Sequence, residues 1–199
     1  MAKGFAPAAE RNRQPILDVL RRVLPDTGLV LEVASGTGQH AVFFSEHLSG
    51  LRWQPSDASV DGLRSIQAWV EESALENLLP PIELDVRSPR WPIASADALL
   101  CINMIHISPW EATESLFRGA SALLAGGSPL VTYGPYRLYG EHSAPSNAAF
   151  DKSLRSRNPR WGVRDIDELT ELAGRTGFEL QESVSMPANN MTLVWARVP

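Results

Sequence analysis

The feature that most constrains the fold is the alternation of short apolar runs with amphipathic stretches. Five segments of strand length lie at residues 29–34, 51–57, 82–86, 97–103 and 129–133, and the first of them is a short apolar run. Apolar residues at helical spacing lie around them, at residues 15–24, 40–48, 59–79 and 110–124, whereas the connection after residue 86 is too rich in Pro and Trp for a full helix. Short continuous apolar runs are typical of buried parallel strands. The sequence therefore predicts an α/β fold with a doubly wound sheet.

The C-terminal third has a different pattern. Residues 134–164 are polar, aromatic and rich in Pro, with one expected helix near 147–155, and a further helix is expected from Asp165. Two last strands, one beginning near Phe178 and one at 191–196, are separated by residues 187–190, which have a turn composition. We expect one domain over residues 1–199, with an N-terminal arm at 1–14 and an acceptor-site lid or insertion at 134–164. The motif from Ser108 to Glu111 predicts a capping box at a helix start.

Composition excludes several classes of protein. The chain has 199 residues, and 18 basic against 23 acidic residues give a net charge of −5, which argues against binding nucleic acid by bulk electrostatics. A single cysteine excludes an internal disulfide framework and a cysteine-based zinc site, and no metal site is predicted. No apolar run approaches the roughly 20 residues of a membrane span, and the N-terminus lacks a signal-peptide pattern. We expect a soluble, cytoplasmic protein without a membrane partner.

A glycine turn follows the first predicted strand. The residues Ser35-Gly36-Thr37-Gly38 lead directly into a helical stretch, where glycine allows a ligand close to the backbone and the helix start offers free N–H groups. The spacing Gly36-x-Gly38-x-x-Ala41 also fits a dinucleotide fingerprint, with Asp57 nineteen residues after Gly38. The turn can therefore be interpreted as a general ligand-binding loop, as a dinucleotide-binding loop, or as a tight turn that binds no ligand.

Three acidic residues help to distinguish a dinucleotide such as NAD from another nucleoside cofactor. Glu32 lies inside the first strand and needs a partner, because a buried unpaired carboxylate is costly; hydrogen bonds from the glycine-loop backbone are one candidate. Asp57 has the two acceptor oxygens needed for both ribose hydroxyls, and Asp85 follows the third strand, where it can accept from an adenine amino group. This arrangement describes a nucleoside site without phosphate-binding basic residues. It favours S-adenosylmethionine over NAD.

On these residues the sequence resembles the class I S-adenosylmethionine-dependent methyltransferases, and more narrowly the methyltransferase-like protein 26-type family, most of whose members have no assigned substrate. The blocks that carry the resemblance span nearly the whole chain. They are Ala8–Asn12, Leu31–His40, Trp53–Asp57, Asn103–Trp110, Tyr133–Tyr136, Ser146–Asp151, Trp161–Asp165 and Met186–Asn190. Ala34 replaces the first glycine of the usual Glu-x-Gly-x-Gly-x-Gly motif, and a methyl group is expected to fit that turn.

The resemblance implies a mostly parallel seven-stranded Rossmann-like sheet with an antiparallel last strand. It also implies that Asp57 holds the ribose, that Asp85 and Val86 flank the adenine, and that Asn103 and Met104 lie beside the methionine portion. S-Adenosylmethionine would be the cofactor and S-adenosylhomocysteine the product. The full set of predicted cofactor residues is Arg11, Asn12, Glu32, Ala34, Gly36, Gly38, His40, Asp57, Asp85, Val86, Asn103 and Met104.

The residues that follow the fourth and fifth strands are candidates for chemistry. His106, with an ordinary pKa near neutrality, is predicted as a general base or substrate contact. Tyr133 is a second catalytic candidate from a window of three tyrosines that can pack against an aromatic acceptor. The predicted substrate-binding residues are Tyr136, Tyr139, Asn147, Asp151 and Arg164. Arg164 ends a basic run from Lys152 that is either a site for an anionic acceptor or a solvated face.

We therefore predict an S-adenosylmethionine-dependent methyltransferase acting on an unidentified small-molecule acceptor. The alternatives are an NAD-dependent oxidoreductase and a non-catalytic S-adenosylmethionine-binding protein. The sequence does not select between methylation of O, N and S, and it leaves the oligomeric state open.

Overall fold

The computed structural model describes residues 3–199, which divide into two compact units. The first unit ends at Leu100 and the second begins at Cys101. The strand β4 (Ala98–Ile102) crosses this boundary. The predicted single domain stays a prediction.

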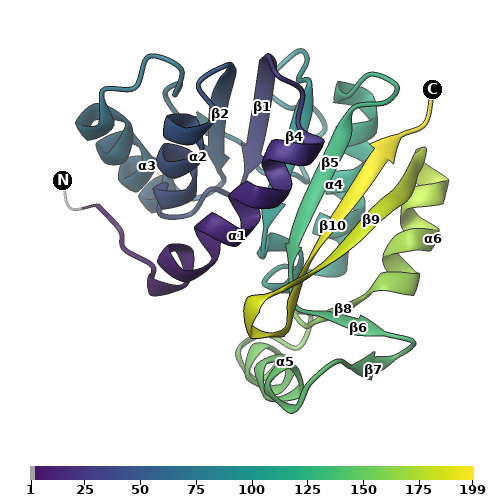
Figure 1. Ribbon diagram of the computed structural model, residues 1–199. Coiled ribbons are helices and arrows are strands. Elements are labelled where there is room, and N and C mark those ends of the chain that lie inside the picture. The colour runs from purple at the N-terminus through teal and green to yellow at the C-terminus, as the bar shows by residue number, and fades with distance from the viewer. Residues whose placement is uncertain (1–2) are drawn as a thin grey trace. The chain divides into compact units, whose positions relative to one another are not determined.

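The first unit consists of helices that alternate with parallel strands (Figure 1). Its elements are α1 (Pro7–Val23), β1 (Gly28–Val33), α2 (Gln39–His47), β2 (Leu51–Asp57), α3 (Val60–Ser73) and β3 (Ile82–Glu83). β1 pairs in parallel with β2 from Gly28↔Leu51 to Glu32↔Pro55, and β2 pairs in parallel with β3. The carboxyl ends of β1 and β2 therefore lie at the same edge, as the predicted ligand site requires.

The core of this unit forms where consecutive residues of β1 and β2 are buried, with the helices packed against them. Val30 and Leu31 of β1 and Trp53 of β2 have no exposed surface, and Phe44 of α2 and Ile66 of α3 are equally buried. The rings of Phe44 and Trp53 have centroids 5.5 Å apart. Burial of such side chains contributes roughly 1.5–3 kcal/mol each, so α2 and α3 are fixed against the strands that carry the glycine turn and Asp57.

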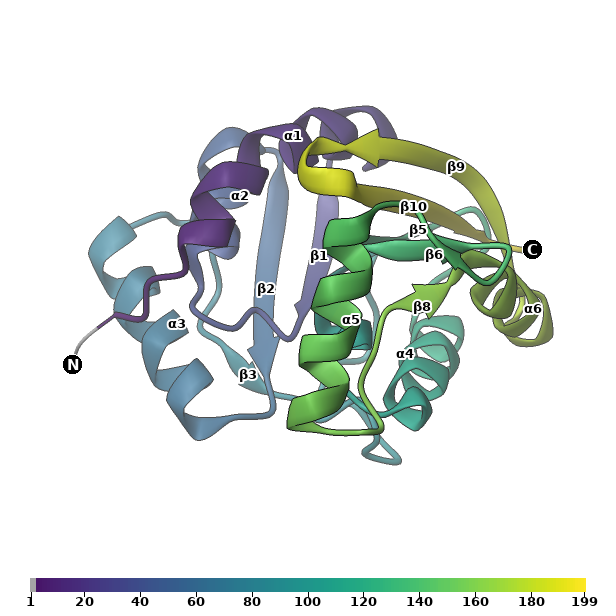
Figure 2. The same ribbon diagram turned by 90° about the horizontal axis from the view of Figure 1, so that it is seen from below.

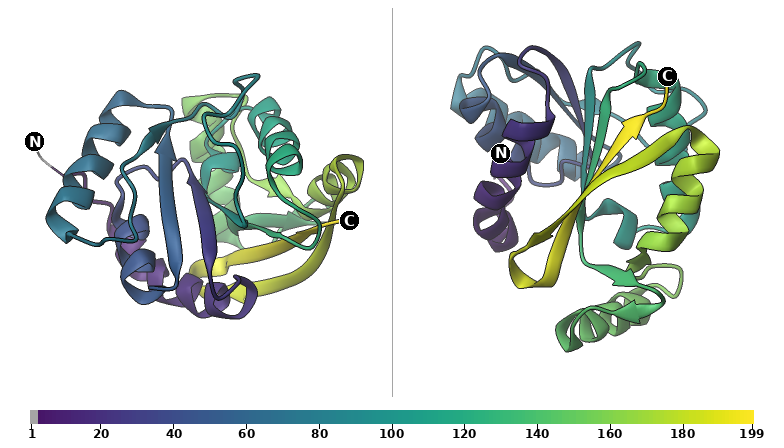
Figure 3. Two further views of the ribbon diagram at one scale, coloured as in Figure 1. Left: turned by 90° about the horizontal axis from the view of Figure 1, so that it is seen from above. Right: turned by 45° about the vertical axis from the view of Figure 1, so that its right-hand side comes forward.

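The second unit contains one long antiparallel hairpin. The elements of the second unit are η1 (Met104–His106), α4 (Trp110–Leu123), β5 (Pro129–Gly134), β6 (Tyr136–Leu138), β7 (Glu141–His142), α5 (Pro145–Arg157), β8 (Arg164–Asp165), α6 (Ile166–Thr176), β9 (Phe178–Met186), η2 (Pro187–Asn189) and β10 (Asn190–Arg197). β10 is antiparallel to both β5 and β9. The hairpin, with η2 as its turn, is yellow in Figure 3, and α6 lies beside β9. Its predicted turn at 187–190 is confirmed.

Residues 134–165 form a small structure of their own. β6 pairs with β7 in an antiparallel and with β8 in a parallel arrangement, which gives the sheet order β7-β6-β8. The helix α5, predicted near 147–155, spans Pro145–Arg157 and is green in Figure 2. The segment predicted as an acceptor-site lid is thus an ordered sheet and helix, and its role as a lid stays a prediction.

The predicted fold class is confirmed. The seven strands of the large sheet have the order β3-β2-β1-β4-β5-β10-β9. The order runs outward from β1 in both directions along the chain, which is the doubly wound arrangement, and the last strand is antiparallel as expected. In the part of the chain that the structure describes, no helix is both long and apolar enough to cross a membrane.

Three local predictions were wrong. The N-terminal arm was expected over 1–14 and the first helix at Pro15, but α1 begins at Pro7 and Pro15 lies inside it. The capping box at Ser108 does not form: α4 has Pro109 at its N-cap and no side-chain cap, because the Ser108 hydroxyl instead contacts Met104 Sδ at 3.4 Å. The third strand is only Ile82–Glu83, so Asp85 lies in the turn beyond it.

Candidate functional site

The glycine turn after β1 is held in an unusual backbone conformation. Ala34, Gly36 and Gly38 have φ of 55°, 59° and 89°, all in the left-handed region. Ser35 N–H donates to Ser56 O of β2 at 2.8 Å, which fixes the turn to the neighbouring strand. Alanine adopts left-handed φ at a cost of roughly 1–2 kcal/mol, so the methyl group at Ala34 fits the turn under strain.

The two glycines face different surroundings. A Cβ at the buried Gly38 would lie 2.9 Å from Ile66 Cα, so this glycine allows α3 to pack against the turn. A Cβ at the exposed Gly36 would meet no atom within 4 Å. The backbone at Gly36 therefore borders open space in the first unit, where a ligand can approach it closely.

Asp57 lies at the end of β2 and is bound to this turn. Its Oδ2 accepts the Gly36 N–H at 2.9 Å and its Oδ1 accepts the Ser59 N–H at 2.8 Å. A carboxylate has about four acceptor positions, so each oxygen keeps one for a ligand. The half-buried side chain is thus fixed with both oxygens able to accept from a vicinal diol, which fits the predicted ribose contact.

Glu32 has a partner that the sequence did not predict. It is 1 % exposed, and its Oε2 accepts the indole N–H of Trp53 on β2 at 2.6 Å. Burial raises its pKa to about 7, against hydrogen bonds from Trp53 and Ser35 that lower it. The side chain therefore braces β1 against β2 below the turn. Trp53 was predicted only as part of a strand, and no sequence signal marks it as the partner.

The predicted residues of α1 contact the start of α2, beside the turn. His40 Nε2 lies 2.7 Å from Asn12 Oδ1, and burial together with the charge of Arg13 lowers the His40 pKa to about 4. His40 is thus neutral and donates to Asn12, whose amide N–H₂ is the group left for a ligand. Arg11 is exposed on α1.

Two further side chains of this contact were not predicted. Gln39 Oε1 accepts the Ala6 N–H at 2.6 Å, and Gln39 Nε2 donates to Glu10 Oε1 at 3.1 Å. These bonds attach the first turn of α1 to the first turn of α2. Figure 1 shows the two helices side by side.

Asp85 has a local partner. Arg87 donates to both of its oxygens, from Nε to Oδ1 at 3.0 Å and from Nη2 to Oδ2 at 2.7 Å. These hydrogen bonds hold the Asp85 pKa below its ordinary value. The backbone N–H of Arg87 also binds Oδ1 at 2.9 Å, so Oδ2 keeps the freer acceptor position for an adenine amino group. The neighbouring Val86 is buried.

The last two predicted cofactor residues belong to the second unit. Asn103 follows β4 with a left-handed φ of 62°, and its N–H donates to Tyr133 O at 2.8 Å. Met104 is 8 % exposed and begins η1. The backbone at Asn103 turns the chain from the strand into η1, which places His106 in the core of this unit.

His106 is fully buried, which the sequence did not indicate. Its Nδ1 accepts the Arg164 N–H at 3.3 Å, and its ring lies edge-on to Tyr136 with centroids 5.0 Å apart. Burial, together with the charge of Arg164, lowers its pKa to about 3. The neutral ring therefore carries its proton on Nε2, which has no hydrogen-bond partner among the described residues. In this tautomer the ring presents a donor, whereas a general base needs a lone pair.

The three tyrosines do not share a surface. Tyr133 and Tyr136 are buried, and the Tyr136 hydroxyl donates to Thr132 Oγ1 at 3.0 Å, while burial raises its pKa. Tyr139 is 85 % exposed at the β6–β7 turn with φ of 54°. Their predicted roles at the acceptor stay predictions, but Tyr136 is placed as a core residue beside His106.

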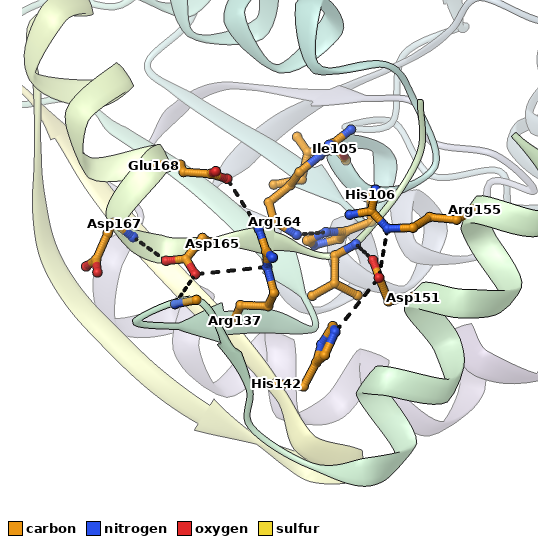
Figure 4. A network of polar contacts seen from close by, with 12 residues as sticks. Ile105, His106, Arg137, His142, Asp151, Arg155, Arg164, Asp165, Asp167 and Glu168 are labelled. Carbon is orange, nitrogen blue, oxygen red and sulfur yellow. Dashed lines mark hydrogen bonds and ion pairs between the residues drawn. The ribbon is translucent and has the colours of Figure 1, made fainter. Parts of the chain in front are cut away.

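The three remaining predicted substrate residues lie in the second unit, and Figure 4 shows two of them, Asp151 and Arg164. Asn147 is 4 % exposed and donates to Ser143 Oγ and to Asn189 O. Asp151 accepts the Val163 N–H at 2.7 Å and Arg155 Nε at 2.8 Å. Burial raises the Asp151 pKa, but these hydrogen bonds outweigh it and hold the pKa below its ordinary value.

Arg164 has the most constrained side chain of the group. Its Nε donates to Ile105 O at 2.9 Å, and its Nη2 donates to Ser108 O at 2.6 Å and to Arg160 O at 3.3 Å. These three carbonyl groups belong to η1, to the start of α4 and to the turn after α5. The guanidinium therefore joins the segments around His106.

Solved methyltransferase structures share this fold. The mitomycin 7-O-methyltransferase MmcR matches with a TM-score of 0.81 and 13 % identity over 96 % of this chain and 54 % of that chain. An O-methyltransferase family 2 protein from Planctomyces limnophilus DSM 3776, in complex with apigenin, matches with a TM-score of 0.83 and 16 % identity over 96 % and 58 %. CalO1, a methyltransferase in calicheamicin biosynthesis with S-adenosylhomocysteine bound, matches with a TM-score of 0.73 and 18 % identity over 94 % and 54 %.

These likenesses place the chain among proteins with the Rossmann-like methyltransferase fold, and it spans little more than half the length of the solved chains it matches. The narrower resemblance to the methyltransferase-like protein 26-type family stays a prediction. Residues 3–197 match the model of a family described as "Protein of unknown function (DUF938)", and the chain belongs to that family.

Proposed function

We propose that this protein is an S-adenosylmethionine-dependent methyltransferase that acts on a small-molecule acceptor. The observation that carries the proposal is the Asp57 carboxylate, fixed by the N–H groups of Gly36 and Ser59 beside a turn with open space at Gly36. Two hydrogen-bond-accepting oxygens at the end of the second strand, next to a glycine turn, suit the two ribose hydroxyls of an adenosine. The fold shared with solved methyltransferases supports the same cofactor class.

Residues of the first unit are suited to bind S-adenosylmethionine. Asp57 would accept the two ribose hydroxyls, and Asp85 Oδ2 would accept the adenine amino group beside Val86. Arg11 is exposed on α1 and suits a carboxylate through bidentate geometry. The Gly36 N–H, a backbone donor that a pyrophosphate would use in such a turn, is given to the Asp57 carboxylate, so NAD is the weaker candidate.

The bound cofactor would supply an activated methyl group on a sulfonium. Its transfer is an in-line displacement, in which positioning and the exclusion of water contribute much of the acceleration. His106 is held in a fully buried position by Arg164 and Tyr136, with its proton on Nε2. We propose that His106 contacts the acceptor. It acts as a base only after the Arg164 N–H···Nδ1 hydrogen bond breaks and the ring proton moves from Nε2 to Nδ1, which frees the Nε2 lone pair.

Calorimetric titration tests the cofactor. S-Adenosylmethionine and S-adenosylhomocysteine should bind, and NAD⁺ and NADH should not. Asp57→Asn should weaken binding by about tenfold or more, since one oxygen becomes an N–H₂ group that cannot accept and the other loses its charge. Asp18→Asn, on the exposed face of α1 where Asp18 accepts a hydrogen bond from Gln14, is the matched control and should bind normally. Binding of the nicotinamide pair alone would contradict the proposal.

An acceptor screen tests catalysis. Small-molecule pools incubated with isotopically labelled S-adenosylmethionine and analysed by mass spectrometry should give a labelled product, whose fragmentation identifies the methylated atom. His106→Gln should lower the rate while leaving S-adenosylmethionine affinity unchanged. Cofactor binding without any transfer would instead favour a non-catalytic binding protein.

A further inference from the structure

A basic cleft of about 340 Å³ lies within the second unit, and four arginines line it: Arg137, Arg155, Arg164 and Arg175. They come from β6, α5, β8 and α6, so the fold gathers them from separate parts of the sequence. Figure 4 shows the first three around the β8 segment. Glu168 and Glu171 are the two carboxylates in the lining, so the cleft is positive in a chain whose net charge is −5.

Arg164 is a buried charge with no ion pair among the described residues, although the charges of Glu168 and Asp151 act on it from farther away. It is 9 % exposed, and its Nε and Nη2 are taken by backbone carbonyl groups, which orient the guanidinium without neutralising it. No carboxylate of residues 3–199 lies within ion-pair distance of it. Its Nη1 is the nitrogen left for a ligand. A buried charge is costly unless it is paired, so an anion in the cleft would supply the missing partner.

Arg137 is likewise incompletely satisfied. Its Nε is buried and has no hydrogen-bond partner among the described residues. The carboxylates near it are distant: Asp165 Oδ2 lies 4.0 Å from Nε, and Glu168 Oε2 lies 3.6 Å from Nη2. Asp165 and Glu168 therefore position the guanidinium without forming the short bidentate bonds that arginine makes with an oxyanion.

The other two arginines complete the lining. Arg155 gives its Nε to Asp151 at 2.8 Å and has a side chain that is 48 % exposed, which leaves its Nη groups for a ligand. Arg175 is exposed in the last turn of α6. Trp110 adds a flat apolar wall, 5.6 Å from the Arg164 guanidinium carbon to the ring centroid.

We propose that this cleft binds a small molecule with two or more oxyanion groups, either phosphates or carboxylates. The size of the cleft suits a small molecule, and the glutamates at its rim together with the acidic net charge oppose a long nucleic acid. The inference goes beyond the proposed methyl transfer: every residue in it lies in the second unit, and it requires no cofactor. Its failure would leave the cofactor site untouched.

The test is calorimetric titration of the full chain with inorganic pyrophosphate and, separately, with citrate, without S-adenosylmethionine. At about 150 mM ionic strength the Debye length is about 8 Å, which suppresses diffuse attraction. We expect one saturable site for at least one probe, and the stronger probe identifies phosphate or carboxylate as the recognised group. No saturable binding of either probe would overturn the proposal.

Three charge variants show whether binding is at the cleft. Arg175→Gln should lower the affinity for the tighter-binding probe by about tenfold, as expected for a lost hydrogen bond to a charged group. Glu171→Gln should raise the affinity for the same probe, because it removes one carboxylate from the cleft lining. Arg118→Gln removes the same charge from the exposed face of α4, outside the cleft, and should have no effect. Equal weakening by Arg118→Gln and Arg175→Gln would mean that only net charge matters, and would also overturn the proposal.

Discussion

The carboxylate of Asp57 occupies the space that a side chain at position 62 would need. A Cβ added to Gly62, in the first turn of α3, would lie 2.7 Å from Asp57 Cγ and 2.8 Å from Oδ1. The absence of a side chain there allows the carboxylate to receive the N–H groups of Gly36 and Ser59. The candidate ribose contact therefore depends on a helix residue that does not itself touch a ligand.

Gly62→Ala should reduce cofactor affinity without the usual gain in stability. Alanine in a helix is favoured over glycine by about 1 kcal/mol, but here the methyl group displaces Asp57. We expect the free energy of unfolding to change little and S-adenosylmethionine affinity to fall about tenfold, equivalent to the loss of one charge-assisted hydrogen bond. Chemical denaturation and calorimetry measure the two effects.

Gly174→Ala is the matched control for this variant. Gly174 lies in α6, and an added Cβ would meet nothing within 4 Å. It should show the normal helix gain of about 1 kcal/mol and unchanged cofactor binding. If Gly62→Ala gives the same gain and binds normally, Asp57 is not positioned in this way.

The two glycines of the turn should respond differently to alanine. Gly38→Ala should lower the free energy of unfolding by more than about 2 kcal/mol, because it adds left-handed strain and a collision with the Ile66 backbone. Gly36→Ala adds only the strain of about 1–2 kcal/mol, since its Cβ enters open space, but it should block the cofactor. Denaturation and calorimetry on both variants test this; normal cofactor binding by Gly36→Ala would contradict the placement of the ligand.

The strands were predictable because their apolar runs are set by burial on both faces. The start of α1 was not, since its first turns contain Ala9 and Asn12 rather than a strong apolar stripe. What holds those turns is tertiary: Asn12 bonds to His40, and Glu10 bonds to Gln39. Such polar contacts between distant segments leave no period in the sequence.

The candidate site shows the same division. Asp57 and the glycines were predictable because they must follow β1 and β2. The burial of His106 was not, because its environment is made by β6 and β8, through Tyr136 and Arg164. Proximity in sequence was also misleading for the tyrosines, since the Tyr136 side chain is buried and Tyr139 lies in the exposed turn after β6.

Glu32 should make the protein less stable as the pH rises. Its folded pKa of about 7 lies above the ordinary value of 4.5, so the folded state binds an extra proton between these values. Stability is therefore greatest below about pH 4.5 with respect to this group and falls as the pH rises through 7. Glu32→Gln keeps an oxygen for Trp53 but cannot ionise, and should be more stable than the wild type by a few kcal/mol at pH 8.

The measurement for Glu32 is the difference in free energy of unfolding between variant and wild type at pH 5 and pH 8, which cancels other titrations. We expect the difference to grow in favour of Glu32→Gln toward pH 8. A constant difference would mean that Glu32 titrates normally and that the Trp53 contact compensates for its burial.

His106 should have the opposite effect. Its folded pKa of about 3 lies below the ordinary value of 6.5, so the unfolded state binds the extra proton between these values. Its contribution is fully present above pH 6.5 and is lost as the pH falls toward 3, by about 1.4 kcal/mol per pH unit. Wild type should therefore lose stability faster than His106→Gln when denaturation is measured from pH 6.5 down to 4. Nitrogen NMR of the ring should show one neutral tautomer, protonated at Nε2, from pH 8 to 5. A ring that titrates near pH 6.5 would mean that His106 is open to solvent. Wild type and His106→Gln would then lose stability in parallel as the pH falls.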